Sequence, residues 1–299
     1  MDLRRLRYFC TVAEELHFGR AADRLGVAQP GLSQQVKNLE AELGTLLFER
    51  SSRRVALTEA GRILYPEAAA LLGAADALEA RARAVAGGRA GRLRVHTTRS
   101  APAGVAAELI DAFRAGYPEV DLELVTGFTG WNLEELLAGR SDVVFVRPPV
   151  EAGTSVVLVD LGEEELVGAL PAGHRLAARR RLRPADLEGE GVVSWPRRNA
   201  PGMHDRIEAQ VWGGRPPRVV REEPDDEQVL RAVAAGAGVA VMIGTRVGSL
   251  RFPGVVVRRF APPAPTVGLA LAWRPRSAPP SAARFVGLAG AGAPKVSAR

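Results

Sequence analysis

The stretch FGRAADRLGVAQPGLSQQVKNLEAEL, residues 18–43, decides the fold of the first part of this chain. Its pattern predicts two short helices joined by a tight turn, because Gly26 favours the left-handed conformation that ends a helix and Pro30 suits the first turn of the next one. Four apolar side chains of the second helix fall within about 60° of one another on a helical wheel. They are Leu32, Val36, Leu39 and Leu43. We expect this face to be buried.

The other face of the second helix is polar. Ser33, Gln34 and Lys37 lie on it, and Gln29 and Pro30 stand at the start of the helix. These side chains offer hydroxyl and amide groups and one cation on a helix of the size that fits a DNA major groove. The pattern favours a helix that reads DNA, although a small, well-packed helical bundle would also satisfy it.

The segments on either side complete a small domain. Residues 3–16 predict an earlier helix with an apolar stripe, and residues 46–58 predict two short strands around the polar tip 51–54, which is a hairpin or wing. Thr58 is a suitable N-cap for the long Ala-rich helix that we expect over residues 59–86. Within that helix, Pro66 predicts either a kink or a later start.

This long helix is too apolar along one side to stand alone in water. The side chains that need a partner are Ile63, Ala70, Leu71, Ala74, Leu78 and Val85. Two interpretations remain open: the helix packs on its own domain, or it pairs with the same helix of a second chain. Glycines at positions 87, 88 and 91 then indicate a domain boundary.

Composition narrows the class of protein. Of 299 residues, 46% are hydrophobic, yet no apolar run reaches the roughly 18 residues of a membrane span. The net charge is +6, but residues 1–58 carry only +2, so charge alone does not indicate DNA binding. Cys10 is the single cysteine and no secretory signal precedes it, so we expect a cytoplasmic protein without disulfides.

Beyond residue 91 the pattern changes to α/β alternation. Runs rich in Val and Leu alternate with amphipathic helices, which indicates parallel sheets covered on both faces, and the length suggests two such lobes. The predicted strands are 93–98, 120–127, 142–146, 155–161, 165–171, 192–195, 218–222, 239–243, 255–260 and 267–273, and the predicted helices are 102–116, 131–138, 203–211 and 225–235.

With these parts in order, the chain resembles the LysR-type transcriptional regulators from end to end. The resemblance is strongest over residues 1–65, in the stretch LRYFCTVAEELHFGRAADRLGVAQPGLSQQVKNLEAELGTLLFERSSRRVALTEAG, and weaker pieces are DVVFVRPP and AAGAGVAVM. It implies an α/β protein with a winged helix-turn-helix at 1–58, a linker and dimerisation helix at 59–88, and an effector-binding domain at 89–299. That domain would have two lobes, as in periplasmic binding proteins: lobe I at 89–162 and 266–299, and lobe II at 163–265.

The resemblance also implies positions that contact DNA. The base-reading positions of the family fall on Gln29, Pro30, Ser33 and Gln34, the wing positions fall on Arg53 and Arg54, and Lys37 would contact a phosphate. A glutamine can pair with adenine through two hydrogen bonds, whereas a serine can serve any base. The alternative is that these are ordinary solvated polar residues.

A small-molecule effector is implied between the lobes, near strand ends that meet helix N-termini, where free N–H groups suit anions. Arg99 could bind a carboxylate or point to solvent, Arg147 could bind the effector or hold the domain together, and a core role is open for Phe128 and Met203. The residues expected in the site are Thr98, Arg99, Ser100, Phe128, Thr129, Arg147, Gly202 and Met203. The chemistry suits a small organic acid, and we expect no cofactor and no bound metal.

Three rival functions fit less well. An enzyme is disfavoured because four scattered histidines show no metal-ligand spacing, GAGVAVMIG lacks the third glycine of a dinucleotide motif, and no G-x-S-x-G or P-loop is present. A free solute-binding protein would not carry a DNA-binding head, and an architectural DNA binder would ignore small molecules. We therefore expect a homodimeric or homotetrameric regulator that binds a partly palindromic operator on double-stranded DNA, with RNA polymerase as a further candidate partner and no membrane contact.

Overall fold

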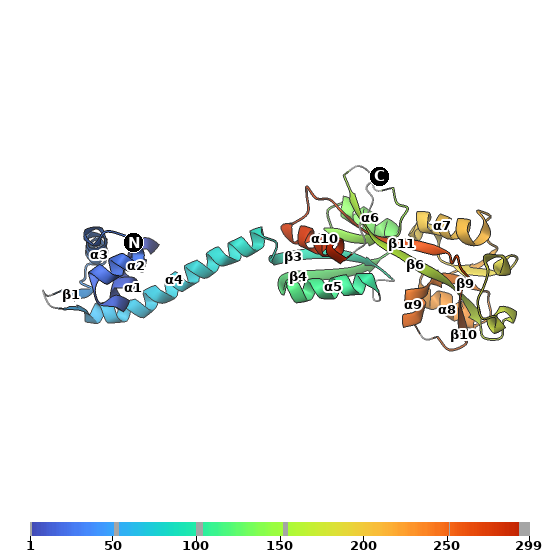
Figure 1. Ribbon diagram of the computed structural model, residues 1–299, viewed down its shortest axis with the longest axis horizontal. Helices are drawn as coiled ribbons and strands as arrows, with labels where there is room; N and C mark the ends of the chain where they lie inside the picture. Colours follow the sequence, from blue (N-terminus) through green and yellow to red (C-terminus); the bar gives the residue numbers. More distant parts are fainter. Residues whose placement is uncertain (1, 51–53, 100–103, 152–154, 251, 293–299) are drawn as a thin grey trace. The chain divides into compact units, whose positions relative to one another are not determined.

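The computed structural model describes residues 2–50, 54–99, 104–151, 155–250 and 252–292. The chain forms two compact units, Met1–Arg83 and Ala84–Arg299, and Figure 1 labels most of their helices and strands. Within the described ranges, no helix is long and apolar enough to cross a membrane.

The first unit is built around three helices, α1 (Leu3–Glu15), α2 (Phe18–Leu25) and α3 (Gln29–Leu43). The predicted turn between α2 and α3 is confirmed, since Gly26 caps α2 with a φ of 65°. The core side chains include Phe9, Val12, Leu32, Val36 and Leu39. Leu43 was expected in this core but is 37% exposed, and it is the last residue of α3, directly before the C-cap Gly44.

The predicted wing is an antiparallel hairpin of β1 (Phe48–Arg50) and β2 (Val55–Leu57), with Phe48 opposite Leu57 and Arg50 opposite Val55. Its tip at 51–53 lies outside the described residues. Thr58 caps the next helix as predicted, since its hydroxyl accepts from the backbone N–H of Gly61 at 2.9 Å.

The long helix α4 (Glu59–Ala86) begins where the sequence predicts and continues through Pro66 without a later start. Its first half packs on the small core through the buried Ala68 and Leu72, and Asp76 pairs with Arg7 at 2.8 Å. Beyond this point Leu78 is 71% exposed and Val85 47% exposed. Packing on its own domain therefore explains only the first half of the helix.

The sheet of the second unit is mixed, so the expectation of purely parallel sheets is wrong. β3 (Ala90–Thr98) runs parallel to β4 (Glu119–Gly127) and β5 (Val143–Val146), but β11 (Thr266–Trp273) is antiparallel to β5. The two strands predicted at 155–161 and 165–171 are one continuous strand, β6 (Val157–Pro171). β6 pairs with β11 along its first part and with β9 (Ala240–Ile243) and β10 (Val255–Arg259) along its second.

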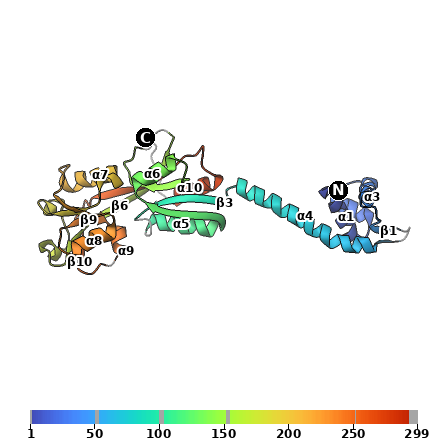
Figure 2. The same cartoon turned by 180° about the vertical axis from the view of Figure 1, so that it is seen from behind.

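The long strand β6 and its neighbour β11 thus join two lobes, each with helices on both faces of its sheet, as Figure 2 shows from behind. In the first lobe, α5 (Val105–Gly116) and α10 (Pro280–Gly292) pack on the face that carries Phe145, and α6 (Thr129–Leu137) packs on the opposite face. The second lobe contains α7 (Pro201–Trp212), α8 (Asp226–Ala234), α9 (Gly244–Ser249), β7 (Val192–Ser194) and β8 (Val219–Glu222), and three short 3₁₀ helices at Arg175–Ala178, Pro184–Leu187 and Arg197–Asn199. The helix α10 has no counterpart among the predicted elements.

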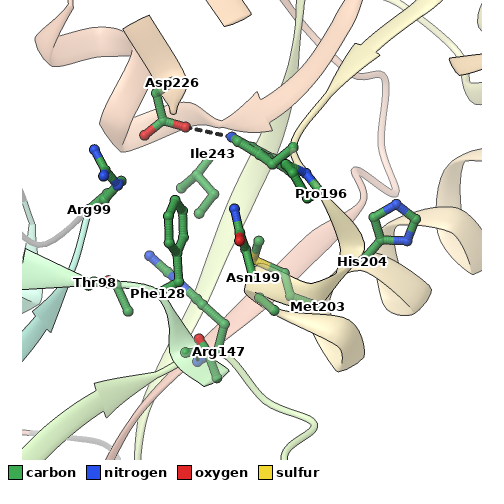
Figure 3. Close-up of a pocket in the computed structure, with 14 residues that line it drawn as sticks. Thr98, Arg99, Phe128, Arg147, Pro196, Asn199, Met203, His204, Asp226 and Ile243 are labelled. Atoms are coloured by element: carbon green, nitrogen blue, oxygen red, sulfur yellow. Dashed lines mark hydrogen bonds between the residues drawn. The ribbon is translucent and has the colours of Figure 1, made fainter. Parts of the chain in front are cut away.

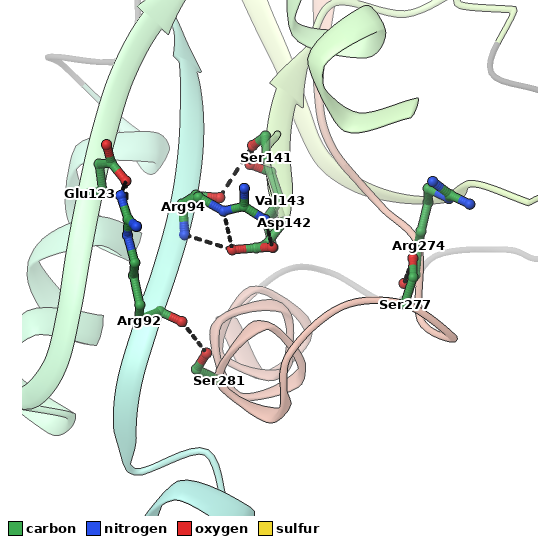
Figure 4. A network of polar contacts seen from close by, with 9 residues as sticks. All are labelled: Arg92, Arg94, Glu123, Ser141, Asp142, Val143, Arg274, Ser277 and Ser281. Atoms are coloured by element: carbon green, nitrogen blue, oxygen red, sulfur yellow. Dashed lines mark hydrogen bonds and ion pairs between the residues drawn. The ribbon is translucent and has the colours of Figure 1, made fainter. Parts of the chain in front are cut away.

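Polar contacts fix the edge of the first lobe where the chain enters it (Figure 4). Arg94 on β3 binds Asp142 with two guanidinium hydrogen bonds of 3.2 and 2.8 Å and a backbone hydrogen bond of 2.9 Å. Ser281 at the start of α10 donates to the backbone carbonyl of Arg92 at 3.2 Å. Because these bonds tie the start of β5 and α10 to β3, the first lobe forms one packed body around the incoming strand.

Candidate DNA-binding face and ligand pocket

The structure brings five of the predicted DNA-contacting residues together on α3. Ser33 is half-buried, and the other four are exposed: Gln29, Pro30, Gln34 and Lys37. The Gln34 amide donates to Asn38 Oδ1 at 2.9 Å, which orders the side chain at the surface. Arg54 is exposed next to β2 on the wing, and Arg53 lies outside the described residues. The face is therefore polar, accessible and carried by a helix fixed to the core.

A buried ion pair between this helix and the wing was not predicted from the sequence. Glu40 on α3 is only 5% exposed, and its Oε2 accepts from Arg50 on β1 at 2.7 Å. Its Oε1 accepts from the backbone N–H groups of Leu47 and Phe48 at 2.9 and 3.2 Å. A carboxylate next to the apolar positions of α3 was the available signal, because an acid on a buried face needs a cationic partner.

In the second unit, a cavity lies where the two lobes meet (Figure 3). Its volume is about 60 Å³. One water needs roughly 10–15 Å³ of such space, so the cavity as it stands holds only a few heavy atoms. The first lobe supplies Thr98, Arg99, Gly127, Phe128, Thr129 and Arg147, and the second lobe supplies Trp195, Pro196, Asn199, Ala200, Met203, His204, Asp226 and Ile243.

Two helices from opposite lobes begin at this cavity. Neither α6, which starts at Thr129, nor α7, which starts at Pro201, has a side-chain cap at its N-terminus. The first N–H groups of a helix have no intrahelical partner, and the helix dipole is positive there. By contrast, α8 is capped by Asp225, and Asp226 follows in its first turn. The wall formed by α6 and α7 is therefore the part of the cavity that suits an anion.

Buried side chains hold the start of α6 in place. The Asn132 amide donates to the backbone carbonyls of Thr97 and Phe145 at 3.2 and 3.0 Å. The Thr129 hydroxyl accepts from the backbone N–H of Arg147 at 3.0 Å. Because these bonds connect α6 to β3 and to the end of β5, its N-terminus is fixed in the cavity wall.

Arg99 extends over the aromatic ring of Phe128, with its guanidinium carbon 4.8 Å from the ring centre. Its Nε has no hydrogen-bond partner, and Arg99 forms no ion pair with the other described residues. Across the cavity, Asp226 accepts from Trp195 Nε1 at 2.9 Å and pairs with Arg246 at 3.1 Å. The acidic group at the cavity is thus already neutralised, whereas the guanidinium of Arg99 has no carboxylate of its own within the described chain.

Arg147 has the structural role that the sequence left open, and it also lies at the cavity where the effector is expected. It lines the cavity, yet it is only 3% exposed and forms an ion pair with Glu164 on β6. Its guanidinium also donates to the carbonyl of Gly268 on β11 at 3.2 Å. Arg147 therefore holds the end of β5 against the two strands that join the lobes.

The predicted effector residue Gly202 is not among the described residues that line the cavity. Gly202 packs against Pro149 so closely that a Cβ there would lie 1.9 Å from the Pro149 carbonyl oxygen. Ser100 lies outside the described residues. The sequence analysis missed Trp195, Pro196, Asn199, His204, Asp226 and Ile243. Several of them could have been found, because ligands bind beyond the carboxyl ends of strands and Trp195 and Ile243 stand at the ends of predicted strands.

Metal ligation finds no support in this part of the chain. Among the residues that the structure describes, no three His, Cys, Asp or Glu side chains are grouped to hold a metal ion. Cys10 is buried in the core of the first unit, and burial raises the pKa of its thiol to about 11. The pocket offers hydrogen bonds, apolar surface and the guanidinium of Arg99, whereas the other two charged lining residues, Arg147 and Asp226, are engaged in ion pairs.

Comparison with known proteins identifies the class of molecule to which these two units belong. The family model described as "Bacterial regulatory helix-turn-helix protein, lysR family" matches residues 3–62, and the "LysR substrate binding domain" matches residues 86–293. The chain is 35% identical over 244 residues to the HTH-type transcriptional regulator IlvR of Caulobacter vibrioides, covering 81% of this chain and 82% of IlvR. It is 31% identical over 291 residues to the Hca operon transcriptional activator HcaR of Escherichia coli, covering 96% and 97%.

Solved structures agree with this result. CbnR, a LysR family transcriptional regulator, matches with a TM-score of 0.84 and 30% identity over 97% of this chain and 100% of CbnR. Full-length CbnR complexed with its target DNA matches with a TM-score of 0.78 and 29% identity over 97% and 98%. The chain belongs to the LysR family of transcriptional regulators. It is a DNA-binding regulator with an effector-binding domain, and it is not an enzyme.

Proposed function

We propose that this LysR-type regulator senses a small organic acid, bound as its carboxylate in the cavity between the lobes. The observation that carries the proposal is the convergence of two uncapped helix N-termini, of α6 and α7, with Arg99 on one small cavity. Backbone N–H groups at such termini and a guanidinium both bind carboxylates well. Phe128 and Met203 add apolar surface for the carbon skeleton of the acid.

We further infer how the first unit binds DNA. The helix α3 would contact base edges through Gln29, Pro30, Ser33 and Gln34, and Lys37 would contact a phosphate. On the wing, Arg53 and Arg54 would contact the adjacent groove or the DNA backbone. Support comes from the accessible polar face of α3. Two such faces in a homodimer or homotetramer would bind a partly palindromic operator. A regulator that binds chromosomal DNA in a bacterium acts in the cytoplasm. Apart from its effector, we propose that it needs no cofactor.

Calorimetric titration of the purified chain tests the effector proposal. Aliphatic and aromatic carboxylic acids are compared with their neutral amides, and the carboxylates alone should bind and raise the melting temperature. For an acid that binds, Arg99→Gln should weaken affinity by about 10-fold to 100-fold, the range for loss of a charged hydrogen bond. Operator affinity without ligand should stay unchanged.

Arg114→Gln is the matched control, because Arg114 is an exposed arginine on α5 that does not line the cavity. Unchanged affinity of Arg99→Gln would remove Arg99 from the site. Amides that bind as tightly as the acids would refute the carboxylate assignment.

A further inference from the structure

We infer that Arg50 on the wing fixes the hydroxyl of Ser33 as a hydrogen-bond donor toward DNA, and that this restricts which base Ser33 accepts. This inference rests on the proposed contact between Ser33 and a base edge. Arg50 would then determine specificity without contacting a base itself.

Two contacts hold Arg50 in place, apart from its hydrogen bond to Ser33. Its Nη2 pairs with the buried Glu40 at 2.7 Å, and its guanidinium carbon lies 4.8 Å from the ring centre of Phe18. Glu40 is itself fixed by the backbone N–H groups of Leu47 and Phe48. Because a buried carboxylate without its cation is strongly disfavoured, Arg50 cannot swing away without destabilising the unit.

The remaining guanidinium edge points at the DNA-reading face. Arg50 Nη1 donates to Ser33 Oγ at 3.3 Å. A guanidinium has no acceptor, so the hydroxyl proton of Ser33 must point elsewhere. Arg50 occupies one of the two lone pairs of Ser33 Oγ, and within the described residues the hydroxyl donates to no other group, so its proton is available to an acceptor on the DNA. The positive charge of Arg50 beside the oxygen further favours an electron-rich acceptor.

A donor at this position discriminates among bases. In the major groove guanine, adenine and thymine each present an acceptor, whereas cytosine presents its N4 amino group, a donor. An unconstrained serine could turn its hydroxyl to accept from cytosine. One lone pair of Ser33 Oγ is already taken by the cationic Arg50, which disfavours a second donor such as the cytosine amino group, so Ser33 should prefer guanine, adenine or thymine to cytosine at the base it contacts.

The test uses the full-length protein and an operator obtained by selection from random DNA. The base contacted by Ser33 is the one at which Ser33→Ala loses discrimination. At that base we expect the wild type to bind the cytosine operator about threefold to tenfold more weakly than the others, the range for one neutral hydrogen bond. Arg50→Met should remove this penalty. The ratio between operators cancels the uniform loss of affinity caused by the missing charge.

A second variant guards against misfolding. The double variant Glu40→Gln, Arg50→Met leaves no buried charge and keeps an acceptor for Leu47 and Phe48, and it should also accept cytosine. With the wild-type protein, 7-deazapurine at the contacted position removes the N7 acceptor. If that base is a purine this change should weaken binding, and it should not affect Ser33→Ala. Arg24→Met is the control, since Arg24 pairs with Glu14 away from Ser33, and it should keep the rejection of cytosine.

The outcomes distinguish the proposed contact of Ser33 with a base from the proposed effect of Arg50 on that contact. If Ser33→Ala changes discrimination at no base, the proposed contact of Ser33 fails, and the role of Arg50 fails with it. If Ser33→Ala loses discrimination but the folded Arg50 variants still reject cytosine, only the inference about Arg50 is overturned.

Discussion

His96 is a buried titratable side chain that has no part in either proposed site. It lies on β3 with 4% of its surface exposed, and its ring stacks on Trp131 with centroids 4.9 Å apart. Burial lowers the pKa of the imidazole, and the nearby carboxylate of Glu135 opposes this shift more weakly. Its Nδ1 has no hydrogen-bond partner within the described chain. The neutral ring is therefore the form that the fold accepts.

This predicts a pH dependence of stability. Because the folded pKa of His96 is lowered from an unfolded value of about 6.5, its neutral form contributes fully above about pH 6.5. That contribution is lost as pH falls through 6.5 toward the folded pKa. We expect His96→Gln to flatten the fall in unfolding free energy between about pH 7.5 and pH 5 in denaturant titrations. Identical slopes for variant and wild type would show that folding does not lower the pKa of His96.

At the scale of elements, the sequence predicts what is periodic and local. The helices α1 to α4 and the wing strands follow directly from apolar spacing, capping residues and turn residues. The continuity of β6 could not be predicted, because Gly162 and three glutamates interrupt its apolar pattern and the strand depends on pairing with β11, β9 and β10. The helix α10 is rich in glycine and alanine and depends on Phe285 packing against Phe113.

The residues of the candidate sites also differ in whether the sequence alone can group them. Residues on one helix face, such as Ser33 and Gln34, can be grouped from spacing alone. The pair of Glu40 with Arg50 and the cavity residues Asn199 and His204 depend on how separate elements pack. Tertiary contacts of this kind leave little trace in a single sequence.

Two glycines of α4 provide a paired test of element packing. A Cβ on Gly61 would lie 2.2 Å from the backbone carbonyl oxygen of Leu47, whereas a Cβ on Gly73 would meet nothing within 4 Å. Gly61→Ala should therefore lower the unfolding free energy of the first unit by about 1–3 kcal/mol through overpacking. Gly73→Ala should raise it by about 0.5–1 kcal/mol, because alanine favours a helix. Calorimetric melting of the full chain measures both, and equal effects of the two substitutions would contradict this account.

At the scale of the whole molecule, α4 exposes an apolar stripe that the rest of the described chain leaves uncovered. The stripe consists of Ile63, Leu71, Leu78 and Val85, all exposed by 47% or more. Their spacing places them on one side of the helix, as in helices that pair with one another. The stripe therefore supports the proposed homodimer.

Leu78→Glu tests this role, and Ala80→Glu is the matched control on the opposite side of the same helix. We expect Leu78→Glu to shift the chain toward monomers in sedimentation analysis and to weaken binding to a palindromic operator by more than tenfold, since two linked half-sites bind through effective concentration. Ala80→Glu should change neither. If both variants keep the same assembly as the wild type, the stripe does not form the interface.

The route of the chain through the second unit has a mechanical consequence. The first strand of that unit, β3, and its last described helix, α10, both belong to the first lobe, and Arg284 of α10 donates to the carbonyl of Gly87 at 3.0 Å. The second lobe is inserted between them and is attached through β6 and β11 (Figure 1). A ligand that draws the lobes together would therefore twist the pair of strands β6 and β11 and rotate the second lobe. The end of α4 would meanwhile stay attached to the first lobe.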